Sequence, residues 1–200
     1  MKTHLPLYLI YLRLLFSLLV ILLAPSALTF APCIVIGLMY AGILSDIFDG
    51  ILARNLNVST ASLRQLDTIV DLVFYFSLVY YLLIFNPSPL QKNSALILVI
   101  LCLEMLMYGT SLSRFGKLPS PHAILSKFWG IYLIVEFTLL LLQVQGAHFT
   151  IALMTGILVH TDRFLIYLFL PLWEHDVPSS WHAWQARHGH AIRRRKLFNG

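Results

Sequence analysis

Long apolar stretches occupy most of this chain and determine the kind of fold it can adopt. A membrane-spanning helix needs about 20 predominantly apolar residues, and six stretches of that kind follow one another. They run roughly over residues 5–24, 28–49, 63–84, 93–112, 122–145 and 148–172. Only 12% of the 200 residues are charged, whereas soluble domains average about 25%. We therefore expect an all-α polytopic membrane protein with six transmembrane helices.

The length of the chain allows one compact bundle and little else. We expect a six-helix transmembrane domain over residues 1–173 and a basic cytoplasmic tail over residues 174–200. In the tail, Trp181 and Trp184 stand three residues apart and the cationic run 193–196 follows. Tryptophan at the headgroup level and cations facing anionic lipid are typical of a helix that lies at the membrane surface.

Positively charged residues fall almost entirely on one side of these stretches. If the N-terminus lies inside, the outer loops carry only Lys92, and Arg13 and Arg163 lie within the apolar stretches. The inner side then carries eleven cations: Lys2, Arg54, Arg64, Arg114, Lys117, Lys127, Arg187, Arg193, Arg194, Arg195 and Lys196. Cytoplasmic loops carry the excess of Lys and Arg, so we expect both termini in the cytoplasm and the protein in the inner membrane. The net charge of +5 reflects this topology, and we expect no nucleic-acid partner.

Four of the nine acidic residues lie between residues 46 and 71, where one apolar stretch ends and the next begins. Asp46, Asp49, Gly50, Ala53 and Arg54 recur at i, i+3, i+4, i+7 and i+8, which is one face of a helix. The two small residues allow another group to approach the backbone closely. The arginine can contact a phosphate or form an ion pair.

The other two aspartates lie on one face of the following helix. Leu63, Asp67 and Asp71 recur at i, i+4 and i+8, and a Ser62–Gln65 capping box predicts a helix start near Leu63. Because only residues 55–62 link the two helices, we expect them to be antiparallel neighbours. Both aspartate pairs then reach the same depth below the inner surface and can converge.

Four ionised carboxylates cannot crowd together in a medium of low dielectric constant without compensation. Arg54 and Arg64 are too few to neutralise them, whereas divalent cations can. Carboxylate oxygens favour Mg²⁺, Mn²⁺ or Ca²⁺ over zinc, and two such ions can stabilise an in-line phosphoryl displacement. A site of this kind beside a slot lined by small residues indicates a phosphate-bearing substrate with a lipid tail.

The spacing D-x2-D-G-x2-A-R-x8-L-x3-D-x3-D, from Asp46 to Asp71, resembles the signature of the CDP-alcohol phosphotransferase (CDP-alcohol phosphatidyltransferase) family. Seven of the eight fixed positions match, and Leu63 stands where the family has glycine. The first apolar stretch has Leu7 and Ile10 where many members have Asn and Thr before an arginine, and Arg13 matches that arginine.

The resemblance implies a homodimeric enzyme whose active site opens to the cytoplasmic leaflet. Such an enzyme transfers a phosphoalcohol group from a CDP-linked donor, here by preference CDP-diacylglycerol, to an alcohol and releases CMP in phospholipid synthesis. The alternative donor is a small CDP-alcohol with diacylglycerol as acceptor. It also implies roles for the signature residues: Asp46, Asp49, Asp67 and Asp71 at two Mg²⁺ or Mn²⁺ ions, Asp71 as general base, and Gly50, Ala53, Arg54 and Leu63 along the donor.

Two other functions compete with this interpretation. Carboxylates within membrane segments are also typical of divalent-cation transporters, but these four cluster at one face and no acidic path crosses the apolar stretches. A catalytically impaired family member that acts as a scaffold is the third possibility, because the side chain of Leu63 would intrude where the nucleotide is expected.

Two further groups of charges have less specific signals. Arg114, Lys117 and Lys127 could bind a phosphate on an acceptor such as glycerol 3-phosphate, or they could simply belong to the positive inner side. The other group, Glu104, Glu136, Asp162 and Arg163, falls within apolar stretches. Ionisable groups there are usually paired, and we expect structural pairs with Arg13 as a candidate partner, ahead of a role at a lipid cavity or a dimer interface.

Overall fold

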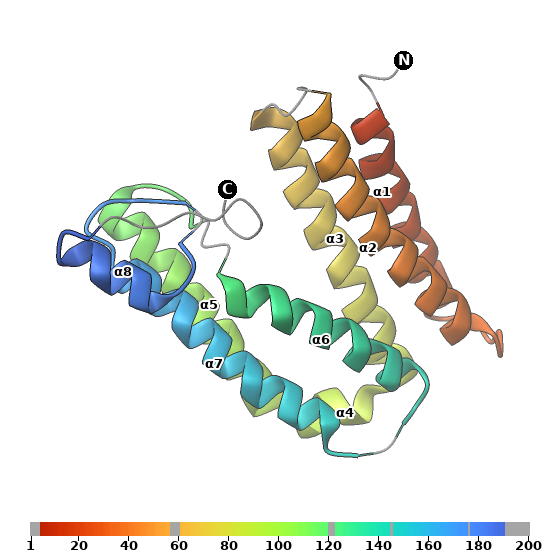
Figure 1. Ribbon diagram of the computed structural model, residues 1–200. Coiled ribbons are helices and arrows are strands. Elements are labelled where there is room, and N and C mark those ends of the chain that lie inside the picture. The colour runs from red at the N-terminus through yellow and green to blue at the C-terminus, as the bar shows by residue number, and fades with distance from the viewer. Residues whose placement is uncertain (1–4, 57–60, 120–122, 145, 176, 191–200) are drawn as a thin grey trace. The chain divides into compact units, whose positions relative to one another are not determined.

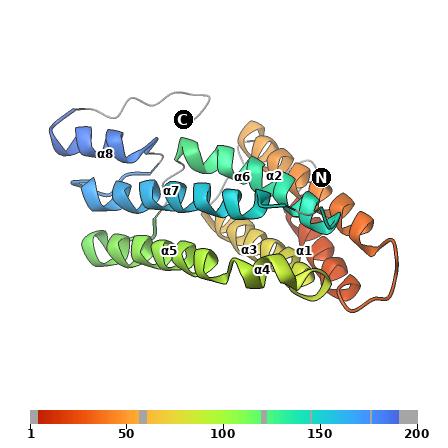
Figure 2. The same ribbon diagram turned by 90° about the horizontal axis from the view of Figure 1, so that it is seen from below.

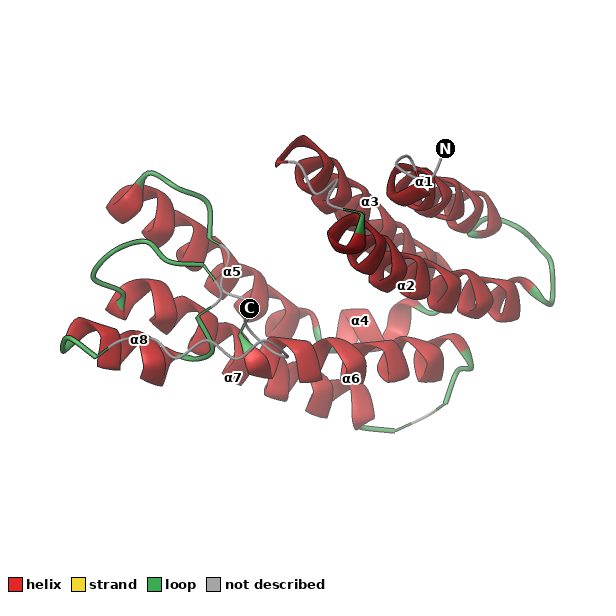
Figure 3. Ribbon diagram, turned by 45° about the horizontal axis from the view of Figure 1, so that its top comes forward, coloured by secondary structure: helices red, strands yellow, loops and turns green. Residues whose placement is uncertain are grey.

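The computed structural model describes residues 5–56, 61–119, 123–144, 146–175 and 177–190. Over these residues the chain forms eight helices and no strand (Figure 3), which confirms the all-α prediction. The helices are α1 (Leu5–Leu23), α2 (Ala31–Asn55), α3 (Ala61–Phe85), α4 (Pro87–Lys92), α5 (Ser94–Phe115), α6 (Ile124–Leu141), α7 (His148–Phe169) and α8 (Ser180–Arg187).

Five of the helices are long and apolar enough to cross a membrane, namely α1, α2 from Ala31 to Asp49, α5, α6 and α7. The helix α3 has 25 residues. Over the described residues, its stretch Ile69–Phe85 forms a shorter apolar helix. The structure is therefore that of an integral membrane protein with five candidate spans, and the sixth span, α3, remains a prediction.

Most helix boundaries lie a few residues from the predicted ones, and α2 extends to Asn55, six residues beyond its predicted end. The helix α3 begins at Ala61, two residues before its predicted start, and the side chains of Ser62 and Gln65 lie outside the described part of the chain. The short helix α4 lies between the third and fourth predicted apolar stretches. Pro87 can occupy the first position of this helix because a helix needs no backbone N–H bond there.

The helices divide between two compact units, and each is described by itself. The first unit comprises Met1–Pro87 with Thr138–Val144. In it α1 packs against both α2 and α3 (Figure 1). The buried residues of α1 recur every three or four positions and form one stripe along the helix: Pro6, Ile10, Arg13, Ser17 and Val20. This stripe carries a cation into the interior of the unit.

Helices α2 and α3 meet at Gly42. A Cβ atom at that position would lie 2.3 Å from Cζ of Phe74, and the Phe74 side chain is 1% exposed. The absence of a side chain at Gly42 therefore leaves the space that this ring fills. The contact lies one helical turn from Asp46 on α2 and near Asp71 on α3, so it helps to hold the two aspartate faces together.

The second unit comprises Ser88–Phe137 with Gln145–Gly200. In it α5 lies along α7 (Figure 2), and α8 packs on α7 through the buried Ala183. The core at this end is formed by Met107, Ala123, Ile166, Tyr167, Leu170, Val177 and Ala183. Gly156 allows Trp129 to approach α7, where the indole Nε1 donates to the carbonyl of Ala152 at 2.9 Å.

The tail forms the predicted short helix, α8. Trp181 and Trp184 on this helix are 59% and 40% exposed, and their rings stack with centroids 5.0 Å apart. Two exposed tryptophans side by side are what a helix at a lipid headgroup layer would present. The cations 193–196 lie outside the described residues.

Candidate functional site

The four aspartates of the sequence signature converge, as their spacing predicted. Asp46 and Asp49 come from α2, and Asp67 and Asp71 come from α3. Carboxylate oxygens of Asp46, Asp49 and Asp67 all lie within 4.8 Å of one another. The side chain of Asp49 is almost fully buried, and those of Asp46, Asp67 and Asp71 are 38%, 32% and 28% exposed. Asp49 is therefore the buried member of the cluster, and the other three aspartates are accessible to ligands.

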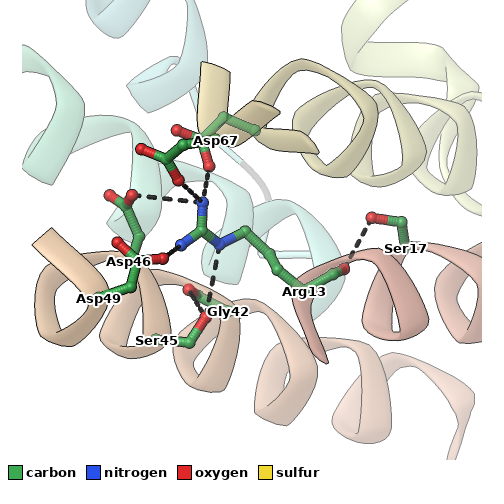
Figure 4. Close-up of polar contacts among 8 residues, drawn as sticks. Arg13, Ser17, Gly42, Ser45, Asp46, Asp49 and Asp67 are labelled. Carbon is green, nitrogen blue, oxygen red and sulfur yellow. Dashed lines mark hydrogen bonds and ion pairs between the residues drawn. The ribbon is translucent and has the colours of Figure 1, made fainter. Parts of the chain in front are cut away.

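Arg13 lies at the centre of this cluster. Its side chain is 1% exposed, and its Nη1 atom lies 3.0 Å from Asp67 Oδ1 and 3.3 Å from Asp46 Oδ1. Nη1 also contacts Asp71, and Nη2 contacts Asp49. Figure 4 shows the guanidinium of Arg13 directed between the carboxylates of α2 and α3.

Two serines, Ser17 on α1 and Ser45 on α2, form hydrogen bonds with Arg13. Arg13 Nε donates to Ser45 Oγ at 3.4 Å, and Ser45 Oγ donates to the carbonyl of Gly42 at 2.7 Å. Ser17 Oγ donates to the carbonyl of Arg13 at 2.9 Å (Figure 4). All three nitrogens of the guanidinium group thus contact oxygen atoms, which orients the side chain within the cluster.

The position of Arg13 adds a cation to the site and corrects one expectation from the sequence. We expected Arg54 and Arg64 to be too few to neutralise the aspartates, and the side chains of both lie outside the described residues. We also expected Arg13 to be a partner for the acids within the apolar stretches, but it pairs with the aspartates instead. The signal was present, because an arginine in an apolar helix requires a carboxylate partner and four were available.

The described charges of the cluster do not balance. Four carboxylates and one guanidinium have a formal charge of 4 × (−1) + 1 = −3 when all are ionised. In a partly buried site, such a charge strongly attracts cations. The described donor atoms near one another are carboxylate oxygens, which suit Mg²⁺ or Mn²⁺. The residues present therefore fit a divalent metal ion.

The residues expected along the donor are only partly described. Gly50, Ala53 and Arg54 belong to α2, but their side chains lie outside the described part of the chain. Leu63 is half-buried on α3, one turn before Asp67. Its position places the leucine on the aspartate face of α3, as the spacing predicted.

The residues expected to bind an acceptor phosphate belong to the second unit. Arg114 donates from Nη1 to the carbonyls of Tyr167 and Leu168, both at 2.6 Å, and from Nη2 to that of Leu170 at 3.0 Å. Arg114 therefore binds carbonyl groups at the C-terminal end of α7. Lys117 Nζ lies 4.8 Å above the ring of Trp173, and Lys127 is exposed on α6.

The acids within the apolar helices are paired, as expected, although with other partners. Glu104 accepts two hydrogen bonds from Arg163, at 2.8 and 3.0 Å, and also contacts His160 Nδ1 at 2.8 Å. Glu136 contacts His148 Nδ1 at 2.6 Å. Asp162 accepts a hydrogen bond from the backbone N–H of Ser180, at 2.9 Å, and so connects α7 to α8.

Comparison with known proteins gives one match. The model of the family described as CDP-alcohol phosphatidyltransferase matches residues 3–161. This range includes Arg13, all four clustered aspartates and the helices that carry them. No curated protein and no solved structure matches the chain.

Proposed function

Because that match covers most of the chain, the protein belongs to the CDP-alcohol phosphatidyltransferase family, and we propose that it transfers a phosphatidyl group from CDP-diacylglycerol to an alcohol. Membership makes it a transferase of phospholipid biosynthesis that uses a CDP-linked donor and an alcohol acceptor. The diacylglycerol-bearing donor is our preference, because its lipid tail suits a cluster of carboxylates at the end of apolar helices. A small CDP-alcohol with diacylglycerol as acceptor is the alternative.

The observation that carries the proposal is the convergence of the four aspartates from two helices. Three of them, Asp46, Asp49 and Asp67, bring carboxylate oxygens within 4.8 Å of one another. These three would hold the divalent ions, Mg²⁺ or Mn²⁺, and by the family pattern two ions with Asp71 beside them. When bound, such ions neutralise the negative charge of the diphosphate during an in-line displacement.

Asp71 is the proposed general base. In the reaction, the hydroxyl oxygen of the acceptor forms a bond to the phosphorus that carries diacylglycerol. The bond from that phosphorus to the oxygen shared with the cytidylyl phosphate breaks, and CMP leaves with the bonding electron pair. The proton of the hydroxyl passes to the carboxylate of Asp71, whose side chain is 28% exposed and can be approached by a substrate.

The donor would lie along the α2 face that continues from the aspartates. By the family pattern, Gly50 and Ala53 would leave space for the donor, and Arg54 would contact a phosphate. Leu63 replaces the glycine of the family pattern, so it narrows the nucleotide slot from the α3 side. We propose that this leucine reshapes the slot, and a slot too narrow for CDP would instead support a scaffold role.

The proposal extends to the acceptor and to the orientation of the protein in the membrane. Lys127 and Lys117 are candidates to bind a phosphorylated acceptor such as glycerol 3-phosphate, and Arg114 would have to share its guanidinium with the carbonyls of α7. The bias of Lys and Arg places both termini in the cytoplasm. We further propose a homodimer with α3 as its sixth span, as the family resemblance implies.

The proposal is tested by purified protein in mixed micelles with CDP-diacylglycerol, Mn²⁺ or Mg²⁺, and a panel of alcohols. We expect CMP release that depends on both the metal and one acceptor. Absence of CMP release with every acceptor, from protein shown to be folded, would contradict the enzyme function. Mn²⁺ uptake into proteoliposomes by that same inactive protein would instead support transport.

A further inference from the structure

We propose that Arg13 is an internal competitor of the divalent ions, so that a metal ion occupies the aspartate cluster only when the guanidinium group withdraws from it. The inference rests on the proposed metal-dependent function, and it assigns Arg13 the role of setting the metal concentration that the protein requires. Arg13 is thereby a positioning residue, because it acts on the carboxylates and not on the reacting atoms.

The first support is that the two cations require the same groups. Arg13 contacts Asp46, Asp49 and Asp67, and these are the three residues whose oxygens could surround a metal ion. Nη1 approaches carboxylates from both α2 and α3. A guanidinium at this position uses the oxygen atoms on which a metal ion would depend.

The second support is electrostatic. Two positive charges among the same carboxylates repel each other, and the repulsion is stronger where little water separates them; the double charge of a divalent ion doubles it. Arg13 is 1% exposed, so little water screens it. Arg13 in its present position and a metal ion among the same carboxylates therefore exclude each other.

The third support is that Arg13 can move without its helix. The guanidinium stands at the end of a long side chain, and Ser45 is its hydrogen-bond partner besides the aspartates among the described residues. The helix α1 is fixed by the rest of its buried stripe, including Ile10 and Val20. In this proposal, a change of side-chain rotamer moves the guanidinium away from the carboxylates while α1 stays in place.

The competition has two consequences. The apparent affinity for a metal ion falls by the fraction of molecules in which Arg13 has withdrawn, so a fraction of one in ten weakens binding about tenfold. The guanidinium also reduces the mutual repulsion of the four carboxylates when the concentration of divalent ions is low. Arg13 thus stabilises the fold and at the same time weakens metal binding.

The test measures Mn²⁺ binding directly, by the electron paramagnetic resonance signal of free Mn²⁺ during titration of purified full-length protein in detergent. The variants are Arg13→Gln, which removes the charge, and Arg13→Lys, which keeps the charge but replaces the planar guanidinium by a single ammonium group. The matched control is Arg163→Gln, which removes an arginine from an apolar helix where it pairs with Glu104.

We expect Arg13→Gln to bind Mn²⁺ about tenfold more tightly than the wild type, Arg13→Lys to show a smaller increase, and Arg163→Gln to match the wild type. Unchanged or weaker binding in both Arg13 variants, with a wild type that binds Mn²⁺, overturns the inference and leaves the proposed function intact. Absence of Mn²⁺ binding in every protein overturns both.

Thermal unfolding gives a second measurement that is independent of activity. We expect Arg13→Gln to melt at a lower temperature than the wild type in EDTA, and Mn²⁺ to raise its melting temperature by more than that of the wild type, because tighter binding stabilises more. Mn²⁺ should not give Arg163→Gln any such extra stabilisation. If Arg13→Gln does not fold in EDTA, Arg13→Lys decides, and an equal Mn²⁺ response in Arg13→Lys and the wild type contradicts the competition.

Discussion

Arg13 on α1 donates a hydrogen bond from Nη1 to Asp67 Oδ1 on α3 at 3.0 Å, although the two residues stand 54 positions apart in the sequence. This bond makes the first helix a part of the aspartate cluster that the family signature places on α2 and α3. The site is therefore built from three helices, and α1 contributes the cation that occupies its centre.

Replacement of the proposed general base should affect the chemical step. We expect Asp71→Asn to lower kcat at least about 100-fold, because general-base catalysis contributes about 10²–10⁴ in rate. Mn²⁺ binding should persist, since Asp46, Asp49 and Asp67 remain. The matched control is Asp162→Asn, an acid on α7 that accepts a hydrogen bond from Ser180, for which we expect near-normal turnover. Undiminished turnover of Asp71→Asn would remove this residue from the mechanism.

Restoration of the family glycine should widen the donor slot. We expect Leu63→Gly to lower KM for CDP-diacylglycerol or to raise kcat, although glycine within a helix costs about 1 kcal/mol of stability. Leu72→Gly has the same helix cost on the opposite face of α3, where the side chain is 52% exposed, and should leave both constants unchanged. Equal kinetic effects of the two variants would show that Leu63 does not line the slot.

Arg114 and Lys127 should differ in what their loss changes. We expect Lys127→Gln to raise KM for glycerol 3-phosphate and to leave KM for the donor unchanged. The control Lys92→Gln, on α4, should alter neither. An unchanged KM in Lys127→Gln would exclude that lysine from acceptor binding.

Arg114→Gln should by contrast reduce the free energy of unfolding by about 1–2 kcal/mol, because it removes charged hydrogen bonds to three carbonyls at the end of α7.

The Glu104–Arg163 pair should be structural. Arg163→Gln leaves a largely buried carboxylate with only His160 as partner, and we expect a loss of about 2 kcal/mol, somewhat less than for a fully buried pair. The double variant Glu104→Gln with Arg163→Gln should recover part of that stability. The measurement is thermal unfolding in detergent. If turnover fell while the melting temperature stayed constant, the pair would have a role in catalysis instead.

Much of the fold follows from local sequence. The lengths of the apolar stretches predicted most of the long helices to within a few residues. The reason is that a segment in lipid must hydrogen-bond its own backbone N–H and C=O groups, which a helix does along its whole length. The helical period likewise predicted which aspartates share a face, and a short link predicted that Asp49 and Asp67 converge. Helix positions and helix faces are determined by residues close together in the sequence, so they can be predicted from it.

The partners of distant residues could not be predicted in the same way. Whether Arg13 meets Asp71 or Glu104 depends on which face of α1 turns toward α2 and α3, and apart from Arg13 and Ser17 the helix offers no polar pattern that would indicate that face. Contacts such as Ser45 to Arg13 and Phe74 against Gly42 also depend on helix rotation. The positions of Arg114 and Glu104 depend in the same way on how α5 lies along α7.

Transfer of a labelled phosphate tests the central claim most directly. CDP-diacylglycerol would carry ³²P in the phosphate next to diacylglycerol, and the protein would receive Mn²⁺ and the alcohol that supports CMP release. We predict that the label moves into a phospholipid containing that alcohol, that CMP is unlabelled, and that Asp46→Asn and Asp71→Asn each lower the transfer at least about 100-fold. Label that does not enter a phospholipid containing that alcohol, or transfer that is undiminished in both variants, would contradict the proposed reaction.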